Sequence, residues 1–292
     1  MEGIVFFGKG GVGKSTVASN VSAVLARGGR KVLHAGCDPK MDSTMALMGR
    51  HIPPFGERAG GAAGEAALRA SIFPARVPGV HCIEAGGPQP GVGCAGLGIG
   101  AMLDAMKDGE LLTRDGYDAA VFDVLGDVVC GGFAAPLRRG FAKKVVIVTS
   151  ETLLSLYAAN RLVQMIENYS RNGVYLAGLA VNAIRPEGVA AAENFARAVN
   201  TRVLGVTLRD PAVGAAEREH RPAVLASPRS DFSVRLVRLA SAIRAAGRPA
   251  SAPRPMSDAE FFAFMEGRLP APARGRARTR PGQARPAGIG PA

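Results

Sequence analysis

Tryptophan is absent from this chain of 292 residues, and aromatic residues make up only 5% of it. A core must therefore be built from Ala, Val, Leu and Ile, because hydrophobic residues still make up 47%. No apolar run approaches the roughly 18 residues that a membrane-spanning helix needs, so we expect no membrane partner. The chain enters an apolar stretch at once, without a charged leader or cleavage site, and no signal peptide is predicted.

Cysteine is also scarce, with four residues. Without an export signal, these thiols favour a reducing, cytoplasmic location. In that compartment cysteines serve in metal ligation or core packing more often than in disulfides.

Acidic residues are fewer than basic ones, and the formal net charge is +12. About half of this excess lies in residues 267–292, which contain no acid. An end rich in Pro, Gly, Ala and Arg is typical of a disordered tail, although it could also contact nucleic acid or an acidic partner. Because the rest of the chain shows no nucleic-acid-binding motif, no nucleic-acid partner is expected. The arginines of the tail are Arg268, Arg274, Arg276, Arg278, Arg280 and Arg285.

Apolar and amphipathic stretches alternate along residues 1–247. An apolar strand at 3–7, a glycine-rich turn, a helix at 14–27 and a strand at 31–35 form a β-α-β unit, which predicts a largely parallel sheet. The sequence therefore predicts an α/β fold: a single domain whose doubly wound, mostly parallel sheet has helices on both faces. Further strands are expected at 80–84, 119–122, 145–149, 177–181 and 202–207, and helices at 98–107, 155–169, 189–199 and 233–245.

Three parts of the chain differ in organisation. Residues 1–247 are predicted to form the main domain, within which 53–79 have little periodicity and predict a loose helix and loop. Residues 248–266 form a C-terminal extension with one short helix, which Ser257 caps at its start. Residues 267–292 are the predicted disordered basic tail.

The strongest motif is Gly-Lys-Gly-Gly-Val-Gly-Lys-Ser at 8–15, which fits G-x-x-x-x-G-K-[ST] between a strand and a helix. Its glycines let backbone N–H groups surround phosphate oxygens, and the helix N-terminus adds positive potential. We expect Lys14 to reach the β- and γ-phosphates of ATP and Ser15 to ligate Mg²⁺, so the predicted α/β fold is a single P-loop NTPase domain. The predicted nucleotide contacts of this loop are Gly8, Lys9, Gly10, Gly11, Val12, Gly13, Lys14, Ser15 and Thr16.

Lys9 adds a second cation to the loop. It makes the motif similar to the deviant P-loop of a family of dimeric ATPases that includes septum-positioning, plasmid-partition and nitrogenase iron proteins. In that family this lysine reaches the nucleotide of the partner subunit. The resemblance implies that Lys9 stabilises phosphate charge only when two subunits close.

Three acids are expected near the nucleotide. Asp123 follows the strand at 119–122, a usual place for a carboxylate of the Mg²⁺ shell. Asp38 follows the strand at 31–35, in a turn with Lys40, and Asp42 lies four residues further on. An aspartate at a strand end is often only a helix cap, but beside a P-loop we favour nucleotide sensing for this segment.

Two of the four cysteines have glycine-rich neighbours. Cys94 lies in Gly-Val-Gly-Cys-Ala-Gly and Cys130 in Asp-Val-Val-Cys-Gly-Gly-Phe. Small neighbours let a bulky inorganic cluster approach the backbone, whose amides can bond its sulfurs. Cys37 and Cys82 accompany apolar strands and are predicted to be small buried hydrophobes.

A cubane cluster needs four thiolates, so two per chain suffice only when a symmetric dimer shares the cluster. Judged by cysteine count alone, the alternative that all four are ordinary buried cysteines has the same weight as a shared cluster.

Taken together, these motifs resemble the nitrogenase iron protein family, over about residues 3–245. The resemblance implies a homodimer that holds one bridging [4Fe–4S] cluster and one MgATP per subunit. It further implies a reductase that passes electrons from ferredoxin or flavodoxin to a nitrogenase-like catalytic component. The matching pieces are 8–15, 36–40, 42–44, 86–88, 91–96, 123–133, 157–160, 178–179 and Asn182, with Arg209 and Asp210 matching more weakly.

Carried over by position, the resemblance assigns roles to single residues. Cys94 and Cys130 become the cluster ligands, and Asp38 and Asp123 serve Mg²⁺ and hydrolysis. Asp127, between Asp123 and Cys130, is implied to relay changes from nucleotide to cluster. The remaining predicted nucleotide contacts are Lys40, Asp42, Asn182 at the adenine, Arg209 and Asp210.

The chain also departs from the family. Leu97 stands where nitrogen-fixing members carry an arginine, on the surface that docks the catalytic partner. Those members are typically acidic, whereas this chain is basic. Docking surfaces set specificity by charge, so we favour a nitrogenase-like system that acts on a tetrapyrrole or a methylthio-alkane over nitrogen fixation itself.

Two other ATPase classes remain as alternatives. A cluster-free partition or positioning ATPase would suit the basic tail but gives the two glycine-flanked cysteines no role, and no amphipathic C-terminal membrane helix is evident. A cluster-carrier ATPase usually has closely spaced cysteines, unlike Cys94 and Cys130.

Overall fold

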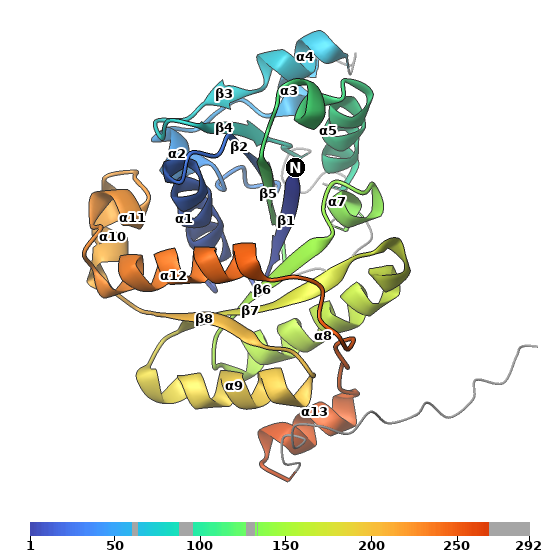
Figure 1. Ribbon diagram of the computed structural model, residues 1–292, viewed down its shortest axis with the longest axis vertical. Coiled ribbons are helices and arrows are strands. Elements are labelled where there is room, and N and C mark those ends of the chain that lie inside the picture. Colours follow the sequence, from blue (N-terminus) through green and yellow to red (C-terminus); the bar gives the residue numbers. More distant parts are fainter. Residues whose placement is uncertain (60–63, 88–95, 127–131, 133, 269–292) are drawn as a thin grey trace, which may run out of the picture.

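A computed structural model describes residues 1–59, 64–87, 96–126, 132 and 134–268. Within these ranges the strands form one sheet of eight, in the order β3-β4-β2-β5-β1-β6-β7-β8 (Figure 1). The pairs are parallel except for the short β3, which runs antiparallel to β4. The predicted α/β fold is confirmed. The strands are β1 Glu2–Phe7, β2 Val32–Cys37, β3 Phe73–Pro74, β4 Val80–Glu84, β5 Ala119–Val124, β6 Lys144–Thr149, β7 Tyr175–Ala183 and β8 Val203–Leu208.

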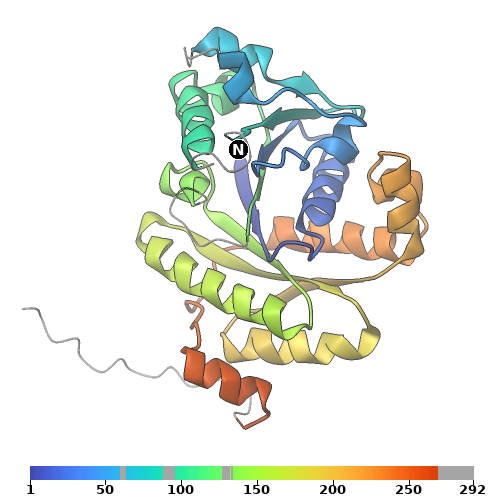
Figure 2. The same cartoon turned by 180° about the vertical axis from the view of Figure 1, so that it is seen from behind.

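Helices cover both faces of the sheet, as Figures 1 and 2 show from opposite sides. One face carries α1, α2, α11 and α12, and the other carries α5, α7, α8, α9 and α13. The α-helices are α1 Lys14–Arg27, α2 Met45–Met48, α3 Phe55–Ala59, α4 Glu65–Ala70, α5 Gly96–Asp108, α6 Leu111–Arg114, α7 Ala135–Arg138, α8 Leu153–Tyr169, α9 Val189–Ala198, α10 Pro211–Arg218, α11 Ala223–Ala226, α12 Asp231–Ala245 and α13 Asp258–Met265. Two 3₁₀ turns, η1 Ser170–Asn172 and η2 Pro186–Gly188, adjoin α8 and α9.

Successive residues of β1 supply the two cores alternately. Ile4 and Phe6 face the core beneath α1 and α12, whereas Val5 and Phe7 face the core beneath α5 and α8. All four side chains are at most 1% exposed. A strand buried on both sides reads as a continuous apolar run, which is why the sequence predicts this central strand well.

The loosely predicted segment 53–79 contains α3, α4 and β3. Leu68 of α4 is buried in the same core as α5, so this segment packs despite its weak periodicity. None of the helices in the described ranges is long and apolar enough to cross a membrane.

The C-terminal extension returns to the main domain. Ser257 accepts a hydrogen bond from the backbone N–H of Glu260 and caps α13, as predicted. Phe261 is fully buried against Tyr157 of α8, with ring centroids 5.2 Å apart. The Asn160 side chain makes two hydrogen bonds with the backbone of Met256, at 2.7 and 2.8 Å. The extension is therefore packed onto α8 and α9 as part of the folded core. The tail from 269 onward lies outside the described residues.

Candidate nucleotide site and the segments beside it

The P-loop joins the end of β1 to α1. Gly11 and Gly13 have φ angles of 78° and 88°, which glycine adopts without steric cost. A Cβ built on Gly8 would come within 2.4 Å of the Val148 carbonyl oxygen, so the loop lies directly against β6. Around Gly11 no described atom lies within 4 Å of a built Cβ, which leaves the outer side of the loop open to a ligand.

Lys14 and Asp123 form a buried ion pair, with Nζ and Oδ1 2.5 Å apart and side chains 7% and 0% exposed. The other carboxylate oxygen of Asp123 accepts a hydrogen bond of 2.6 Å from Ser43. Burial favours the protonated acid, but the Lys14 charge and the hydrogen bonds from Lys14, Ser15 and Ser43 lower the pKa of Asp123 below its usual value. The site therefore holds an ionised carboxylate beside the P-loop lysine.

β5 is longer than predicted and places Asp123 inside the strand. The expected end at 122 was wrong, because Val124 is apolar and still pairs with Cys37 of β2. Asp123 pairs with Gly36 of β2 on one side and Phe6 of β1 on the other. Parallel strands present their carboxyl ends at one edge, so the end of β5 lies beside the P-loop.

The segment after β2 lies at the same edge. Asp38 is 3% exposed and accepts a hydrogen bond of 2.9 Å from the Lys40 backbone N–H, in the turn that the sequence predicts. The Lys40 ammonium lies 3.5 Å from Asp38 and 3.7 Å from Asp42. Because Lys40 is 62% exposed, these pairs hold the turn only weakly.

Three further predicted nucleotide contacts lie at the ends of β7 and β8: Asn182 is in β7, and Arg209 and Asp210 follow β8. Asn182 donates a 2.9 Å hydrogen bond to the Val12 carbonyl and accepts one of 2.9 Å from Thr207. Its side-chain nitrogen would lie 2.4 Å from a Cβ on Gly13, so Asn182 supports the P-loop from its β7 side.

Asp210 has a structural task in the described chain. Its carboxylate accepts hydrogen bonds from the backbone N–H groups of Ala212, at the start of α10, and Phe232, in α12. Arg209 is exposed. Nucleotide binding by Arg209 and Asp210 stays a prediction.

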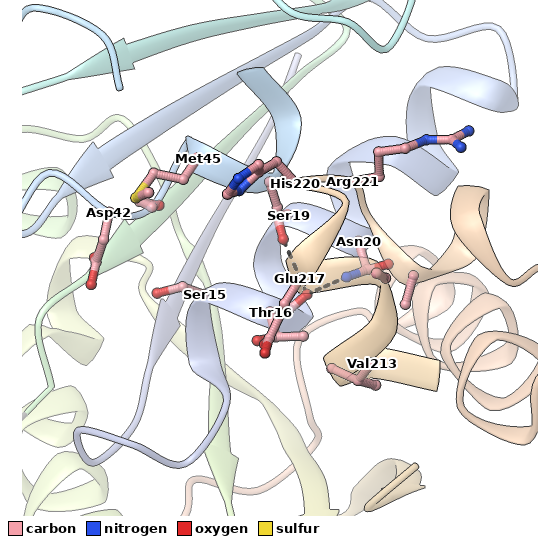
Figure 3. Close-up of a pocket in the computed structure, with 14 residues that line it drawn as sticks. Ser15, Thr16, Ser19, Asn20, Asp42, Met45, Val213, Glu217, His220 and Arg221 are labelled. Atoms are coloured by element: carbon pink, nitrogen blue, oxygen red, sulfur yellow. Dashed lines mark hydrogen bonds between the residues drawn. The ribbon is translucent and has the colours of Figure 1, made fainter. Parts of the chain in front are cut away.

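A cavity of about 300 Å³ lies between α1, α2 and α10 (Figure 3). In Figure 3, Ser15 of α1 and Val213 of α10 lie on opposite sides of the view, with Thr16 and Glu217 between them. Asn182, Arg209 and Asp210 are not among its lining residues. The cavity is lined by Ser15, Thr16, Ser19, Asn20, Asp42, Ser43, Met45, Ala46, Val213, Ala216, Glu217, His220, Arg221 and Ala223.

The segment that leaves β5 touches the P-loop backbone. A Cβ built on Gly126 would lie 1.8 Å from the Gly8 carbonyl oxygen, so only a glycine allows this approach without a shift. Leu125 donates a backbone hydrogen bond of 3.4 Å to Cys37. Residues 125 and 126 are thus fixed between the P-loop and β2.

Cys94, Cys130 and Asp127 lie outside the described residues, and their roles stay predictions. Cys37 and Cys82 are fully buried in β2 and β4, as predicted. Burial raises the pKa of both thiols, with the charge of Glu84 adding to this effect. Neutral buried thiols are poor metal ligands, because a thiolate is the ligating form. Within the described ranges no three His, Cys, Asp or Glu side chains are grouped to hold a metal.

The elements that flank Cys94 and Cys130 are paired. α5 begins two residues after Cys94, and α7 begins five residues after Cys130. Arg139, which directly follows α7, donates hydrogen bonds of 2.6 and 2.8 Å to Asp104 of α5. The two cysteine segments therefore enter helices that pack together, an arrangement that fits a shared cluster.

Several polar residues of the site were missed from the sequence. Ser43 binds Asp123, and Glu84 accepts a 2.9 Å hydrogen bond from the Thr44 backbone N–H. His34 of β2 is fully buried next to Ser43. One signal was available: His34 is the only strongly polar side chain in β2, and Glu84 ends the largely apolar strand β4, where an unpaired buried polar group is costly.

Known proteins resemble this chain over most of its length. The family described as 4Fe-4S iron sulfur cluster binding proteins, NifH/frxC family, matches residues 2–268. Nitrogenase iron protein 2 of Paenibacillus durus is 41% identical over 231 residues, which cover 78% of each chain. The nitrogenase iron protein of Methanospirillum hungatei is 40% identical and covers 83% of this chain and 88% of its own.

Solved structures of other ATPases share the fold. The MinD cell division protein of Aquifex aeolicus matches with a TM-score of 0.65 at 20% identity, covering 86% of this chain and all of its own. A ParA family ATPase from Chlorobium tepidum matches with a TM-score of 0.64 at 17% identity, covering 82% of this chain and 98% of its own. At such identities the likeness concerns the fold alone.

Proposed function

Because the chain belongs to the NifH/frxC family of 4Fe–4S cluster binding proteins, we propose that it is the ATP-dependent electron-transfer component of a nitrogenase or nitrogenase-like complex. One observation carries the proposal within the chain itself. Asp123 pairs with the P-loop lysine, and three residues later Gly126 lies against the P-loop backbone, on the segment that leads to Cys130. A single short segment thus connects the nucleotide site to a proposed cluster ligand.

The described residues fit MgATP. The open side of the P-loop can receive the phosphates, toward which Lys14 would turn and so release Asp123. Ser15 and Asp123 offer the oxygen ligands that Mg²⁺ and its water shell prefer. Asp38, buried at the same edge, is proposed to serve hydrolysis, and Lys9 to act on the nucleotide of a second copy. When bound, MgATP supplies the free energy of hydrolysis.

Cys94 and Cys130 are the proposed cluster ligands. They would supply two of the four thiolates, and the same two residues of a second copy would supply the others. Exclusion of the two buried thiols supports this choice, because Cys37 and Cys82 are held neutral inside the sheet. The paired helices α5 and α7 would hold the two segments at one surface. When bound, the cluster supplies one-electron redox chemistry.

The partner is proposed to be a nitrogenase-like catalytic component, with ferredoxin or flavodoxin as electron donor in the cytoplasm. Leu97, the second residue of α5 and three positions after Cys94 in the sequence, is 78% exposed and offers an apolar side chain to a partner. Together with the net positive charge, it supports a tetrapyrrole or methylthio-alkane system. The names of the relatives favour the alternative, a nitrogen-fixing dinitrogenase reductase.

The deciding experiment measures iron in the anaerobically purified protein, together with the EPR spectrum of its reduced form with and without MgATP. We expect about four irons per dimer and a signal that changes on adding MgATP. Cys94→Ala and Cys130→Ala should each lose both. Cys37→Ala and Cys82→Ala are the matched controls and should retain the iron.

An iron-free dimer that still hydrolyses ATP would refute the redox proposal and favour a partition or positioning ATPase. Retention of iron in both Cys94→Ala and Cys130→Ala would refute the ligand assignment alone. The choice of partner is tested separately, by measuring electron transfer to each purified class of catalytic component.

A further inference from the structure

His34 is a polar residue in the middle of a buried apolar strand. It lies in β2, between β4 and β5, and its side chain is 0% exposed. Both ring nitrogens have partners: Nδ1 lies 2.8 Å from the Ser22 hydroxyl of α1, and Nε2 lies 3.0 Å from the Ser43 hydroxyl. Neither serine is more than 1% exposed. His34 thus links α1 to the segment that follows β2.

Ser22, His34, Ser43 and Asp123 form a series of hydrogen bonds, and the direction of each bond follows from the Asp123 carboxylate at its end. Ionised Asp123 can only accept, so the Ser43 hydroxyl donates its one proton to Asp123 Oδ2, at 2.6 Å. The Ser43 oxygen must then accept from His34 Nε2–H. With its proton on Nε2, His34 accepts at Nδ1 from the Ser22 hydroxyl.

The imidazole stays neutral in this arrangement. Burial, opposed by the Asp123 charge, lowers the pKa of His34 to about 4. At neutral pH the ring therefore has one proton, and its two serine partners fix which nitrogen holds it.

We propose that His34 is a positioning residue for MgATP: through Ser43 it holds the Asp123 carboxylate in place when Lys14 turns to the phosphates. Asp123 is held by Lys14 on Oδ1, by Ser43 on Oδ2 and by a hydrogen bond from Ser15. Binding of MgATP would draw Lys14 to the phosphates and Ser15 to Mg²⁺, so Ser43 becomes the anchor that keeps the carboxylate oriented toward the Mg²⁺ shell. Without the Nε2–H donor, the Ser43 hydroxyl could rotate away. This inference rests on the proposed MgATP site.

A role confined to packing makes a different prediction. A histidine that only fills the core would lose stability on substitution but would not alter the contribution of Mg²⁺ to ATP binding. A positioning residue alters that contribution, since groups that orient a metal's ligands typically change metal affinity or activity by about 10- to 100-fold.

The test measures ATP affinity of the full-length protein by calorimetry, with and without Mg²⁺. In His34→Leu the gain in affinity from Mg²⁺ should fall by about tenfold or more, with affinity for Mg²⁺-free ATP little changed. His34→Gln should recover most of the gain, because its amide nitrogen can replace Nε2–H. Val32→Ala is the matched control: it is buried on the same face of β2, has an apolar side chain, and should lose stability but retain the Mg²⁺ gain.

The ¹⁵N spectrum of the imidazole gives a second readout. The wild-type spectrum should show His34 with its proton on Nε2, and this signal should shift when MgATP replaces ATP. The opposite tautomer would overturn the proposal, as would an unchanged Mg²⁺ gain in His34→Leu.

If His34→Leu does not fold, His34→Gln and His34→Asn decide the question. The shorter asparagine side chain reaches only toward Ser22, so His34→Asn should lose the gain in ATP affinity from Mg²⁺. His34→Gln should keep this gain. Equal Mg²⁺ gains in the two variants would overturn the proposal. A wild-type protein that binds no ATP would instead refute the proposed function.

Discussion

The carboxyl group of Glu84 occupies the space beside Gly36 on the neighbouring strand: a Cβ built on Gly36 would lie 1.8 Å from Glu84 Oε2. The side chain is fully buried, and Oε1 accepts the backbone N–H of Thr44. Within the described part of the chain, Oε2 has no hydrogen-bond partner. An acid in such a place favours its neutral form.

Glu84 should therefore make the protein less stable as the pH rises. Burial raises the pKa of Glu84 to about 8, above the value of about 4.5 of an unfolded glutamate. Between these values the folded state holds the proton and the unfolded chain releases it, so the free energy of unfolding falls by up to about 1.4 kcal/mol per pH unit. Glu84→Gln should remove this slope in urea unfolding between about pH 6.5 and 8, where His34 is neutral in the folded state and largely neutral in the unfolded chain. The exposed Glu57→Gln should leave the slope unchanged, and an equal slope in both variants would contradict the assignment.

Breaking the Lys14–Asp123 pair should destabilise the nucleotide-free protein. Lys14→Met leaves the Asp123 carboxylate buried without its counter-ion, which typically costs about 3–5 kcal/mol. Chemical denaturation without nucleotide measures this loss. Arg235→Ala, which breaks the exposed pair with Asp231, is the control and should change stability by less than about 1 kcal/mol. Similar losses of stability in both variants would show that the buried pair stabilises the protein no more than an exposed pair does.

Gly126→Ala should separate the nucleotide site from the cluster. The added methyl group would collide with the Gly8 carbonyl, so either the P-loop or the segment after β5 must shift. We expect weaker ATP binding and a smaller EPR response to MgATP, at unchanged iron content. At Gly247 a Cβ meets no described atom within 4 Å, so Gly247→Ala is the control. A normal EPR response in Gly126→Ala would disprove coupling through this contact.

Two adjacent phenylalanines of α13 should differ in their effect on stability. Phe261 is 0% exposed and Phe262 is 48% exposed. Phe261→Ala should cost about 3–5 kcal/mol by thermal or chemical unfolding, as large-to-small changes in a core do. Phe262→Ala should cost much less, since half of its surface is already in water. Equal costs would mean that α13 is not packed as described.

Local patterns explain what the sequence predicts well. The P-loop, the helix that follows it and the central strands are continuous segments. Their glycines and apolar runs identify them without any knowledge of distant contacts. The strand β3 was missed because it has two residues, one of them a proline, and it depends on its pairing with β4.

The electrostatic part of the site could not be predicted from such patterns. Ser43 and Asp123 are separated by 80 positions, and only the parallel pairing of β2 with β5 places them together. The same holds for Lys14, whose buried partner lies 109 positions away. Cys94, Cys130 and Asp127 stay predictions, supported by the family and by the packing of α5 on α7.

The P-loop is held from both halves of the sheet, by Gly126 beyond β5 and by Asn182 at the end of β7. A ligand that stiffens this loop must therefore limit the opening of strands on either side of β1. Amide hydrogen exchange should slow in β2 and in β7 together when nucleotide binds, although these strands share no hydrogen bond. Nucleotide occupancy would then be recorded across the width of the sheet, far from the phosphates themselves.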